Sequence, residues 1–249
     1  MKIIGVIQAR LGSSRLQNKV LLEINGKPML WHIYNRLSKS KLLDQIVIST
    51  GDIKNNFAIH EFALKNNIPI YVGSESDLID RLYQTALYYN ASAIVRITGD
   101  CPLVDPQIID AMVSEYNNKN QQYDIITNCK ISTYPHGLDA EIYSILTLEK
   151  MWYSIKQSEL REWFPFYIDK NPQLFRIMHF KNKEDLSKLR WTVDYVEDYE
   201  FVKKIYEHLY KENSVFTMND ILNLLKTHPK ISEINSKYVD FHNIGAPKV

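Results

Sequence analysis

The chain has 249 residues and a mass of 29.2 kDa, with 45% hydrophobic and 24% charged residues. These are ordinary globular proportions, so the composition excludes a disordered chain and a low-complexity scaffold. Lysine and arginine number 30 against 29 aspartates and glutamates, which gives a formal net charge of +1. That balance argues against a protein that binds nucleic acid mainly through bulk positive charge.

Cysteine content and the N-terminal sequence indicate where the protein works. Cys101 and Cys129 are its two cysteines, so an oxidised disulfide framework is not expected. The apolar run at residues 3–7 is shorter than a signal peptide requires, and no apolar run approaches the roughly 20 residues of a membrane span. The sequence therefore predicts a cytoplasmic protein with neither a membrane nor a nucleic acid as partner.

Strands and helices are predicted to alternate through the first half of the chain. Residues 2–7 are almost continuously apolar and β-branched, as in a strand that is buried on both faces. Further strands are expected at 46–48, 68–72 and 93–97, and helices at 28–37, 55–65, 77–89 and from Pro106 onward. Alternation with short loops implies parallel strands with helices on both faces, that is, a three-layer α/β fold.

The second half of the chain has a less regular pattern. Strands are expected at 124–127, 140–143 and 175–180, and helices at 144–157, 161–168, 197–209 and 218–225. Neither a linker nor an internal repeat interrupts the sequence, so residues 1–249 are predicted to form a single domain. The irregular stretch from about 127 to 190 is expected to cover or extend the binding edge of the sheet.

The loop after the first strand is the first candidate site, since ligands of open parallel sheets bind beyond the carboxyl ends of the strands. Residues 12–14 (Gly-Ser-Ser) allow a close backbone approach and offer amide and hydroxyl donors to an anion. Arg10, Arg15 and Lys19 add three positive charges to the same loop. A solvated basic turn is the alternative, but three cations directly after a buried strand favour a phosphate site.

Two aspartates are candidate magnesium ligands. Asp100 follows the fourth predicted strand, and Asp194 lies after a short apolar run and before a helix. One or two carboxylates together with phosphate oxygens form a typical Mg²⁺ environment. Asp100 could instead be a turn former and Asp194 a helix-start residue, a role that Glu197 or Asp198 would fill equally well. A shared metal ion would explain both placements together.

Three ordered motifs carry a resemblance that spans almost the whole chain. Residues 8–19 (Gln-Ala-Arg-Leu-Gly-Ser-Ser-Arg-Leu-x-x-Lys), with 26–30 after them, resemble the start of the cytidylyltransferase family that includes CMP-sialic acid and CMP-Kdo synthetases. Residues 98–106 and 190–194 resemble its two acidic metal segments, and residues 134–141 are similar to the branch of spore coat polysaccharide biosynthesis protein F. The resemblance implies a Rossmann-like fold of the nucleotide-diphospho-sugar transferase type.

The same resemblance implies the reaction. A Mg²⁺-dependent enzyme would transfer CMP from CTP to a sugar, sugar phosphate or related acceptor and release pyrophosphate, for surface polysaccharide or glycan biosynthesis. Arg10, Lys19 and Asp100 are the expected catalytic residues, and Asp100 and Asp194 the expected metal ligands. The residues expected at the nucleotide are Ala9, Arg10, Leu11, Gly12, Ser13, Ser14, Arg15, Lys19, Arg81, Thr98 and Gly99. For Arg81, pairing with Asp77 and Asp80 on its own helix is the favoured alternative.

Departures from the family pattern concern the loop and the acceptor. Asn18 replaces a glycine before the loop lysine, and asparagine can adopt the same left-handed conformation. Trp163 stands where the branch tends to have histidine, and His136 where arginine is more usual. The residues expected at the acceptor are His136, Asp139, Glu141 and Arg161. The sequence leaves the acceptor unidentified, and dimerisation is expected only because related enzymes pair.

Two other functions compete with this interpretation. A glycosyltransferase that uses a nucleotide sugar could share the architecture, but no two aspartates lie two positions apart, as its usual metal motif requires. A non-catalytic nucleotide-binding protein would be expected to lack the metal acids or the loop cations, and all of them are present.

Overall fold

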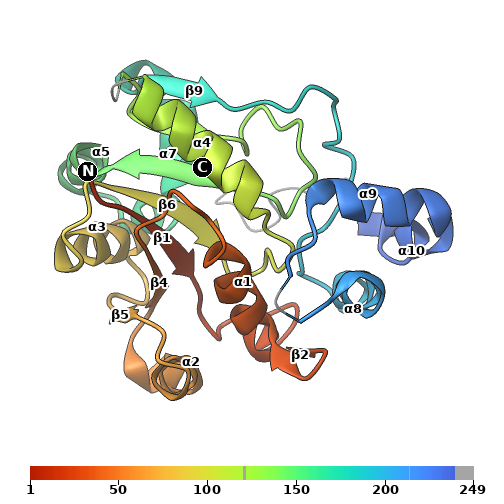
Figure 1. The fold of residues 1–249 in the computed structure, drawn as a ribbon. Coiled ribbons are helices and arrows are strands. Elements are labelled where there is room, and N and C mark those ends of the chain that lie inside the picture. The colour runs from red at the N-terminus through yellow and green to blue at the C-terminus, as the bar shows by residue number, and fades with distance from the viewer. Residues whose placement is uncertain (120–121, 213, 239–249) are drawn as a thin grey trace.

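A seven-stranded sheet forms the centre of the molecule, for which a computed structural model describes residues 1–119, 122–212 and 214–238 (Figure 1). Residues 239–249, part of the single expected domain, lie outside this description. In spatial order the strands are β5 (Ile70–Val72), β4 (Gln45–Thr50), β1 (Ile3–Gln8), β6 (Ala93–Thr98), β8 (Glu141–Ser144), β7 (Ile125–Thr127) and β9 (Ile177–His179). β8 runs antiparallel to both of its neighbours, and the other pairs are parallel, which confirms the mostly parallel α/β sheet.

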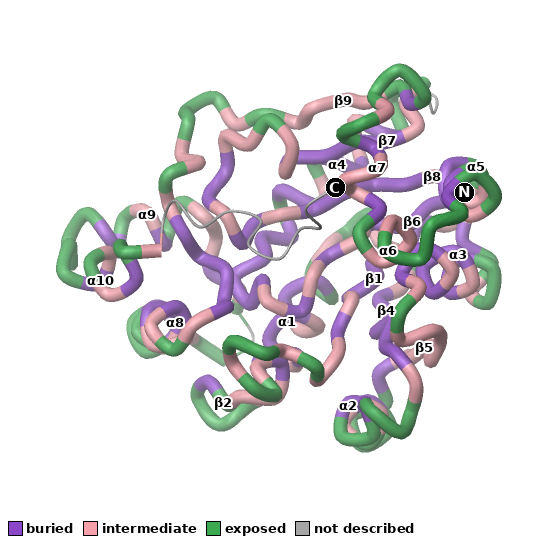
Figure 2. Tube along the Cα trace, turned by 180° about the vertical axis from the view of Figure 1, so that it is seen from behind, coloured by how far each residue is buried: buried purple, intermediate pink, exposed green. Residues whose placement is uncertain are grey.

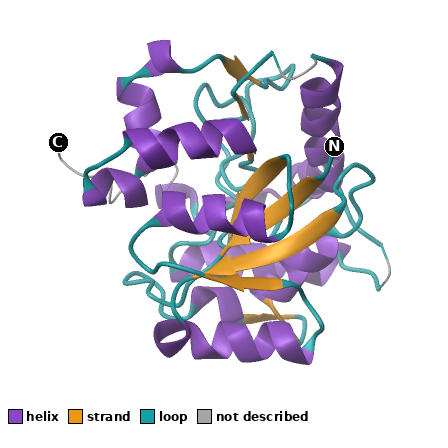
Figure 3. Cartoon of the chain, turned by 90° about the vertical axis from the view of Figure 1, so that its left-hand side faces the viewer, coloured by secondary structure: helices purple, strands orange, loops and turns teal. Residues whose placement is uncertain are grey.

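Helices cover both faces of this sheet, which gives the three layers seen edge-on in Figure 3. The helices are α1 (Met29–Leu37), α2 (Ile53–Lys65), α3 (Leu78–Tyr88), α4 (Pro106–Asn118), α5 (Ile145–Ser154), α6 (Ser158–Glu162), α7 (Phe164–Lys170), α8 (Val196–Leu209), α9 (Met218–Thr227) and α10 (Pro229–Glu233). Ile3 and Ile7 of β1 pack with α1, α2 and α4, whereas Ile4 and Val6 pack with α3, α5 and α7. The alternation of β1 side chains between two cores explains its continuous apolar sequence. Figure 2 shows the central strands buried between these layers.

The strand order has a switch point between β1 and β6. From β1 the chain moves outward to β4 and β5, then returns to pair β6 with the other side of β1. Gln8 and Thr98, the last residues of the two strands, lie in register, and the Gly99 amide donates to the Gln8 carbonyl at 2.8 Å. A Cβ on Gly99 would lie 3.0 Å from that carbonyl oxygen, so glycine permits the close approach. The two predicted ligand loops therefore start side by side at the switch point, where open α/β sheets bind ligands.

The second half of the chain extends the sheet through β8, β7 and β9. The helix expected at 161–168 is instead two short helices, α6 and α7, with a break at Trp163 (φ −108°, ψ 40°). The hairpin of β2 (Glu23–Ile24) and β3 (Lys27–Pro28) and the short helix α10 were not predicted, because elements this short carry no clear periodicity. Helices α8, α9 and α10 lie beyond the carboxyl ends of β1 and β6 (Figure 1).

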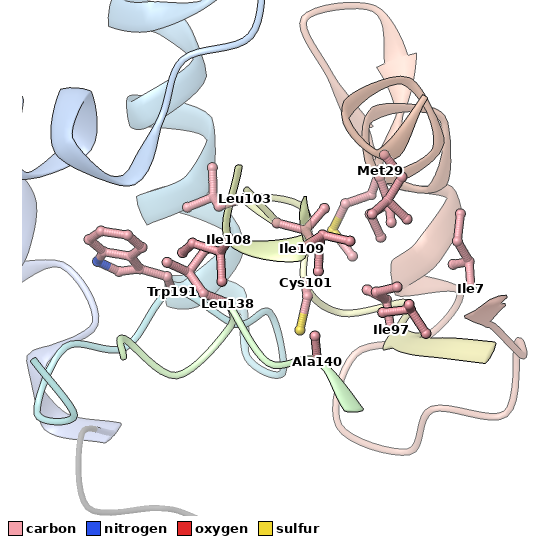
Figure 4. Close-up of a cluster of buried hydrophobic side chains, with 14 of the residues drawn as sticks. Ile7, Met29, Ile97, Cys101, Leu103, Ile108, Ile109, Leu138, Ala140 and Trp191 are labelled. Atoms are coloured by element: carbon pink, nitrogen blue, oxygen red, sulfur yellow. The ribbon is translucent and has the colours of Figure 1, made fainter. Parts of the chain in front are cut away.

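One hydrophobic cluster holds the segments of the site together. Figure 4 shows Ile7 and Ile97 from the two central strands on one side of this cluster, Cys101 in the middle, and Leu138 and Trp191 on the other side. All five side chains are at most 1% exposed. The loop after β6, the turn before β8 and the segment before α8 are thereby fixed relative to the sheet. Within the described ranges, no helix is long and apolar enough to cross a membrane.

Candidate active site

Lys19 lies at the centre of the site, between the two predicted metal acids. Its ammonium nitrogen Nζ is 3.0 Å from Asp100 Oδ2, 2.9 Å from Asp194 Oδ1 and 2.8 Å from the Val193 carbonyl oxygen. Three segments that are far apart in the sequence therefore converge on one cation at the carboxyl edge of the sheet. We call residues 9–19 the cation loop and residues 190–198 the acid segment.

The charges at this centre stabilise one another. Burial by itself would raise the pKa of Asp100, but the Lys19 ammonium and the Thr98 hydroxyl, which donates to Asp100 Oδ1, hold that pKa well below its usual range. Burial likewise opposes the charged form of Lys19, yet the carboxylates of Asp100 and Asp194 raise its pKa. Asp100 is therefore an anion and Lys19 a cation at neutral pH.

Asp194 is braced from several directions. Its Oδ1 accepts from Arg15 Nη2 at 2.7 Å, and its Oδ2 lies 3.2 Å from Arg190 Nη2. Arg190, only 3% exposed, also pairs with Asp198 at 2.8 and 2.9 Å. Asp198 Oδ2 in turn accepts the backbone amide of Asp194 at 3.0 Å, and Asn235 Nδ2 donates to Asp198 Oδ1 at 2.9 Å. The acid segment is thus held by buried, charge-assisted hydrogen bonds.

Backbone contacts set the distance between the two aspartates. The Val193 amide donates to the Asp100 carbonyl at 2.8 Å, and the Thr192 hydroxyl reaches the same oxygen at 3.2 Å. These bonds involve only main-chain atoms and one short side chain. They therefore fix the position of the loop after β6 relative to the acid segment. The two carboxylates therefore face the same side of the switch point.

The cation loop is more open than the acid segment. Gly12, Ser14 and Arg15 are exposed, and a Cβ built on Gly12 would meet no atom within 4 Å, so a ligand could approach the backbone there. Its fixed points include the Leu11 amide, which donates to Asn56 Oδ1 at 2.9 Å. Asn18 has φ 53° and ψ 25°, which confirms the left-handed conformation predicted for it.

Arg10 and Arg81 lie on the β5 side of the site. Arg10 Nη1 is 2.7 Å from Glu162 Oε1, a partner that the sequence pattern gave no reason to expect. Arg81 is fully buried, and its Nη1 donates to the carbonyls of Ser74 and Glu75. The pairing of Arg81 with Asp77 and Asp80 was the wrong alternative: Asp77 pairs with Arg161, and Asp80 accepts from Trp152.

Two of the residues expected at the acceptor adjoin the aspartates. His136 Nδ1 is 3.5 Å from Arg190 Nη1, and His136 Nε2 is 3.6 Å from Asp139 Oδ2. The turn that carries them is tied to the acid segment, because Trp191 donates its amide to the His136 carbonyl at 2.6 Å. Gly137 has φ +113°, and a Cβ there would lie 2.4 Å from Thr192 N, so only glycine fits this turn.

The other two expected acceptor residues have structural partners instead. Glu141 is 3% exposed and pairs with Arg96, whose Nε donates to Gln8 Oε1 at 2.8 Å. Arg161 pairs with Asp77 and donates to the carbonyls of Trp152 and Ile155, both at 2.8 Å. Glu141 is buried against Arg96 and Arg161 is engaged by three partners, so we leave both residues out of the acceptor site proposed below.

The donor set around Lys19 fits a magnesium ion. Two carboxylates from separate segments already share one cationic group, and Mg²⁺ in nucleotide enzymes is commonly held by one or two carboxylates together with substrate phosphates. Among the described residues, no group of three or more His, Cys, Asp and Glu side chains is placed to hold a metal ion. Phosphate oxygens and water would therefore supply the remaining ligands.

Comparison with known proteins agrees with this geometry. The cytidylyltransferase family matches residues 4–233. An uncharacterized protein of Methanocaldococcus jannaschii is 37% identical over 95% of both chains, and spore coat polysaccharide biosynthesis protein SpsF of Bacillus subtilis is 28% identical over 91% of this chain and 95% of its own. A solved cytidylyltransferase from Leptospira borgpetersenii superposes with a TM-score of 0.88 at 34% identity, covering 93% of this chain and 96% of that one. The chain therefore belongs to the cytidylyltransferase family and is a nucleotidyltransferase with its fold.

Proposed function

We propose that the protein transfers CMP from CTP to a sugar-type acceptor and releases pyrophosphate, with Mg²⁺ bound by Asp100 and Asp194. The observation that carries this proposal is that the carboxylates of Asp100 and Asp194 both lie within 3.0 Å of Lys19 Nζ, at the switch point of the sheet. Family membership supports the nucleotide, and the relative named for polysaccharide biosynthesis supports the acceptor class. The cytoplasmic location and the dimer predicted from sequence belong to the same proposal.

The proposed reaction is an in-line displacement. An acceptor oxygen forms a bond to the α-phosphorus of CTP as the bond from that phosphorus to the bridging oxygen of pyrophosphate breaks. Pyrophosphate leaves with the bond electrons, and the proton of a hydroxyl acceptor passes to solvent or to the released pyrophosphate. When bound, Mg²⁺ polarises the α-phosphoryl group as a Lewis acid. The protein's own part is to position both reactants and to stabilise the spread negative charge.

The three loop cations are the groups that we assign to the triphosphate. Each of them already has a carboxylate partner: Arg10 pairs with Glu162, Arg15 with Asp194, and Lys19 with both aspartates. The bound triphosphate would replace those carboxylates as the partner of the cations, while the aspartates would turn to the metal. This exchange keeps the local charge balanced before and after binding, which limits the desolvation penalty of an unpaired charge.

His136 and Asp139 are our candidates for the acceptor side. Burial raises the pKa of Asp139, against the opposing effects of His136 and of the Gly137 amide, so this carboxyl group takes up a proton more readily than an exposed aspartate. A protonated or shared carboxyl can donate to a sugar hydroxyl or phosphate oxygen, and the imidazole can donate or accept. Both residues lie on the turn that is fixed to Trp191, and hence to the acid segment.

The test is pyrophosphate release with each of the four nucleoside triphosphates and a panel of sugars and sugar phosphates. We expect release only with CTP, an acceptor and Mg²⁺ together, and its loss on chelation with EDTA. Release of UDP from a UDP-sugar would indicate a glycosyltransferase, and nucleotide binding without turnover across a broad panel would indicate a non-catalytic protein. Either result would overturn the proposal.

A further inference from the structure

Arg81 has a buried guanidinium group that is only partly hydrogen-bonded to the described residues. The side chain is 0% exposed, and only Nη1 has acceptors, the carbonyls of Ser74 and Glu75. Nε and Nη2 are buried and have no hydrogen-bond partner in the described part of the chain. A buried, unsatisfied charged donor is costly, so it calls for a physical explanation, and a bound ligand that accepts from it is one.

Glu162 offers an acceptor of the same kind. Its Oε1 pairs with Arg10, but its Oε2 is buried and has no hydrogen-bond partner among the residues described. Burial lowers the pKa of Arg81, and the Glu162 carboxylate is the strongest charge opposing that shift. Burial raises the pKa of Glu162, against the charges of Arg10 and Arg81. The charges of the two side chains therefore stabilise each other, and two donor nitrogens and one acceptor oxygen have no partner within the described residues.

These atoms lie at one end of the proposed nucleotide site. Arg81 contacts the residues that follow β5, whereas Lys19 and the two aspartates lie at the ends of β1 and β6. Arg10 connects the two ends, since it belongs to the cation loop and pairs with Glu162. A nucleotide whose phosphates contact Lys19 and Arg15 would place its base toward Arg81 and Glu162.

We propose that Glu162 is the residue that selects the base, and that it does so together with Arg81. Cytosine presents two acceptors, O2 and N3, and one amino donor, N4. The free N–H groups of Arg81 donate to the acceptors, and Glu162 Oε2 accepts from the amino group. Uracil presents a carbonyl oxygen in place of that amino group, so the carboxylate repels it. The selection is therefore partly repulsive.

This inference rests on the proposed function, and its experiment separates the two. We would measure pyrophosphate release with CTP and with UTP for the wild-type enzyme and for Glu162→Gln, at a fixed acceptor and Mg²⁺ concentration. Glutamine is isosteric, and its amide can turn to donate to the uracil carbonyl. We expect the preference for CTP, expressed as the ratio of the two kcat/KM values, to fall about tenfold or more, mainly through KM.

Use of the ratio removes the indirect effect through Arg10. Loss of the Glu162–Arg10 pair would change triphosphate binding equally for CTP and UTP, so it cancels in the ratio. The matched control is Glu159→Gln, an exposed glutamate on the same helix, which should leave the ratio unchanged. Titration with CMP and UMP, which lack the β- and γ-phosphates, should show the same fall in preference.

Each outcome is decisive for one of the two proposals. An unchanged ratio in Glu162→Gln, with circular dichroism showing a native fold, would overturn the assignment of base selection to Glu162. A wild-type enzyme that releases no pyrophosphate from CTP with any acceptor, yet binds CMP in preference to UMP through Glu162, would overturn the proposed function and leave the base assignment standing.

Discussion

The cation loop and the acid segment meet at Lys19 and Asp194 but are built in opposite ways. The acid segment is buried and braced by Arg190, Asp198 and the backbone of the neighbouring loop. The cation loop has exposed residues and an open approach at Gly12. Under the proposed function, the acids would form a fixed metal platform and the cations would adapt to the phosphates. Changes in the acid segment should therefore affect folding and catalysis together, whereas changes in the loop should affect binding alone.

The largest expected effect on the reaction rate comes from removal of one of the two carboxylates proposed to bind Mg²⁺. Asp100→Asn should lower the rate of pyrophosphate release at least about 1,000-fold, because one of the two carboxylates for Mg²⁺ is lost. Lys19 keeps Asp194 and the Val193 carbonyl as partners but loses one of its two carboxylates, so the urea midpoint should fall while the protein stays folded. A near-normal rate would exclude Asp100 from the metal site.

The next variant tests the buried ion pair of Arg190 and Asp198, the brace of the acid segment. Asp198→Asn removes the fully buried counter-charge of Arg190, and we expect a loss of about 3 kcal/mol in the free energy of unfolding together with reduced turnover. Urea denaturation and the transfer assay measure the two effects. Glu197→Gln, at the adjacent half-exposed position, removes only a surface ion pair with Lys237 and should change both quantities little. Equal behaviour of the two variants would mean that the brace does not stabilise the platform.

A steric change at Gly137 tests how tightly the turn on the acceptor side is packed against the acid segment. Gly137→Ala places an alanine at a φ of +113°, with its Cβ 2.4 Å from Thr192 N. We therefore expect it to lower the free energy of unfolding by about 3 kcal/mol. Gly26→Ala is the matched control, since its φ is +73° but its Cβ would meet no atom within 4 Å, so it should lose only about 1 kcal/mol. Thermal or urea unfolding gives both values. If the two losses are equal, the turn is not clamped against the acid segment.

The smallest effect is expected in the loop. Gly12→Ala adds a methyl group where no protein atom lies within 4 Å, so stability should stay within about 0.5 kcal/mol of the wild type. Affinity for CTP should fall on the order of tenfold, because the methyl group hinders one charge-assisted contact between the backbone and phosphate. Calorimetric titration with CTP measures this, with Gly26→Ala as the control. An unchanged affinity would place the triphosphate elsewhere.

The regular half of the fold could be predicted from sequence because its signals are local. Buried parallel strands such as β1 read as continuous apolar runs, and α3 begins where Asp77 accepts the Asp80 amide, at the start of the helix predicted at 77–89. The motifs also identified Lys19, Asp100 and Asp194, which the structure brings together. Family membership and the three-layer α/β fold were likewise predicted correctly.

The rest of the site depends on contacts between residues that are distant in the sequence. The pair of Arg10 and Glu162 joins residues 152 positions apart, and no periodicity or spacing can indicate such a partner. The same holds for Asn235, which reaches Asp198 from the C-terminal helices. The prediction for Arg81 was wrong for the reverse reason: local spacing favours the acids at positions 77 and 80, but the buried side chain donates to the backbone carbonyls of Ser74 and Glu75.

The hydrogen bond from Asn235 to Asp198 also has a consequence for synthesis of the chain. The cations of the loop leave the ribosome within the first 19 residues, but Asn235, which completes the support of the acid segment, emerges more than 200 residues later. All seven strands of the sheet, the last of which ends at His179, are therefore translated before the residue that completes the support of Asp198.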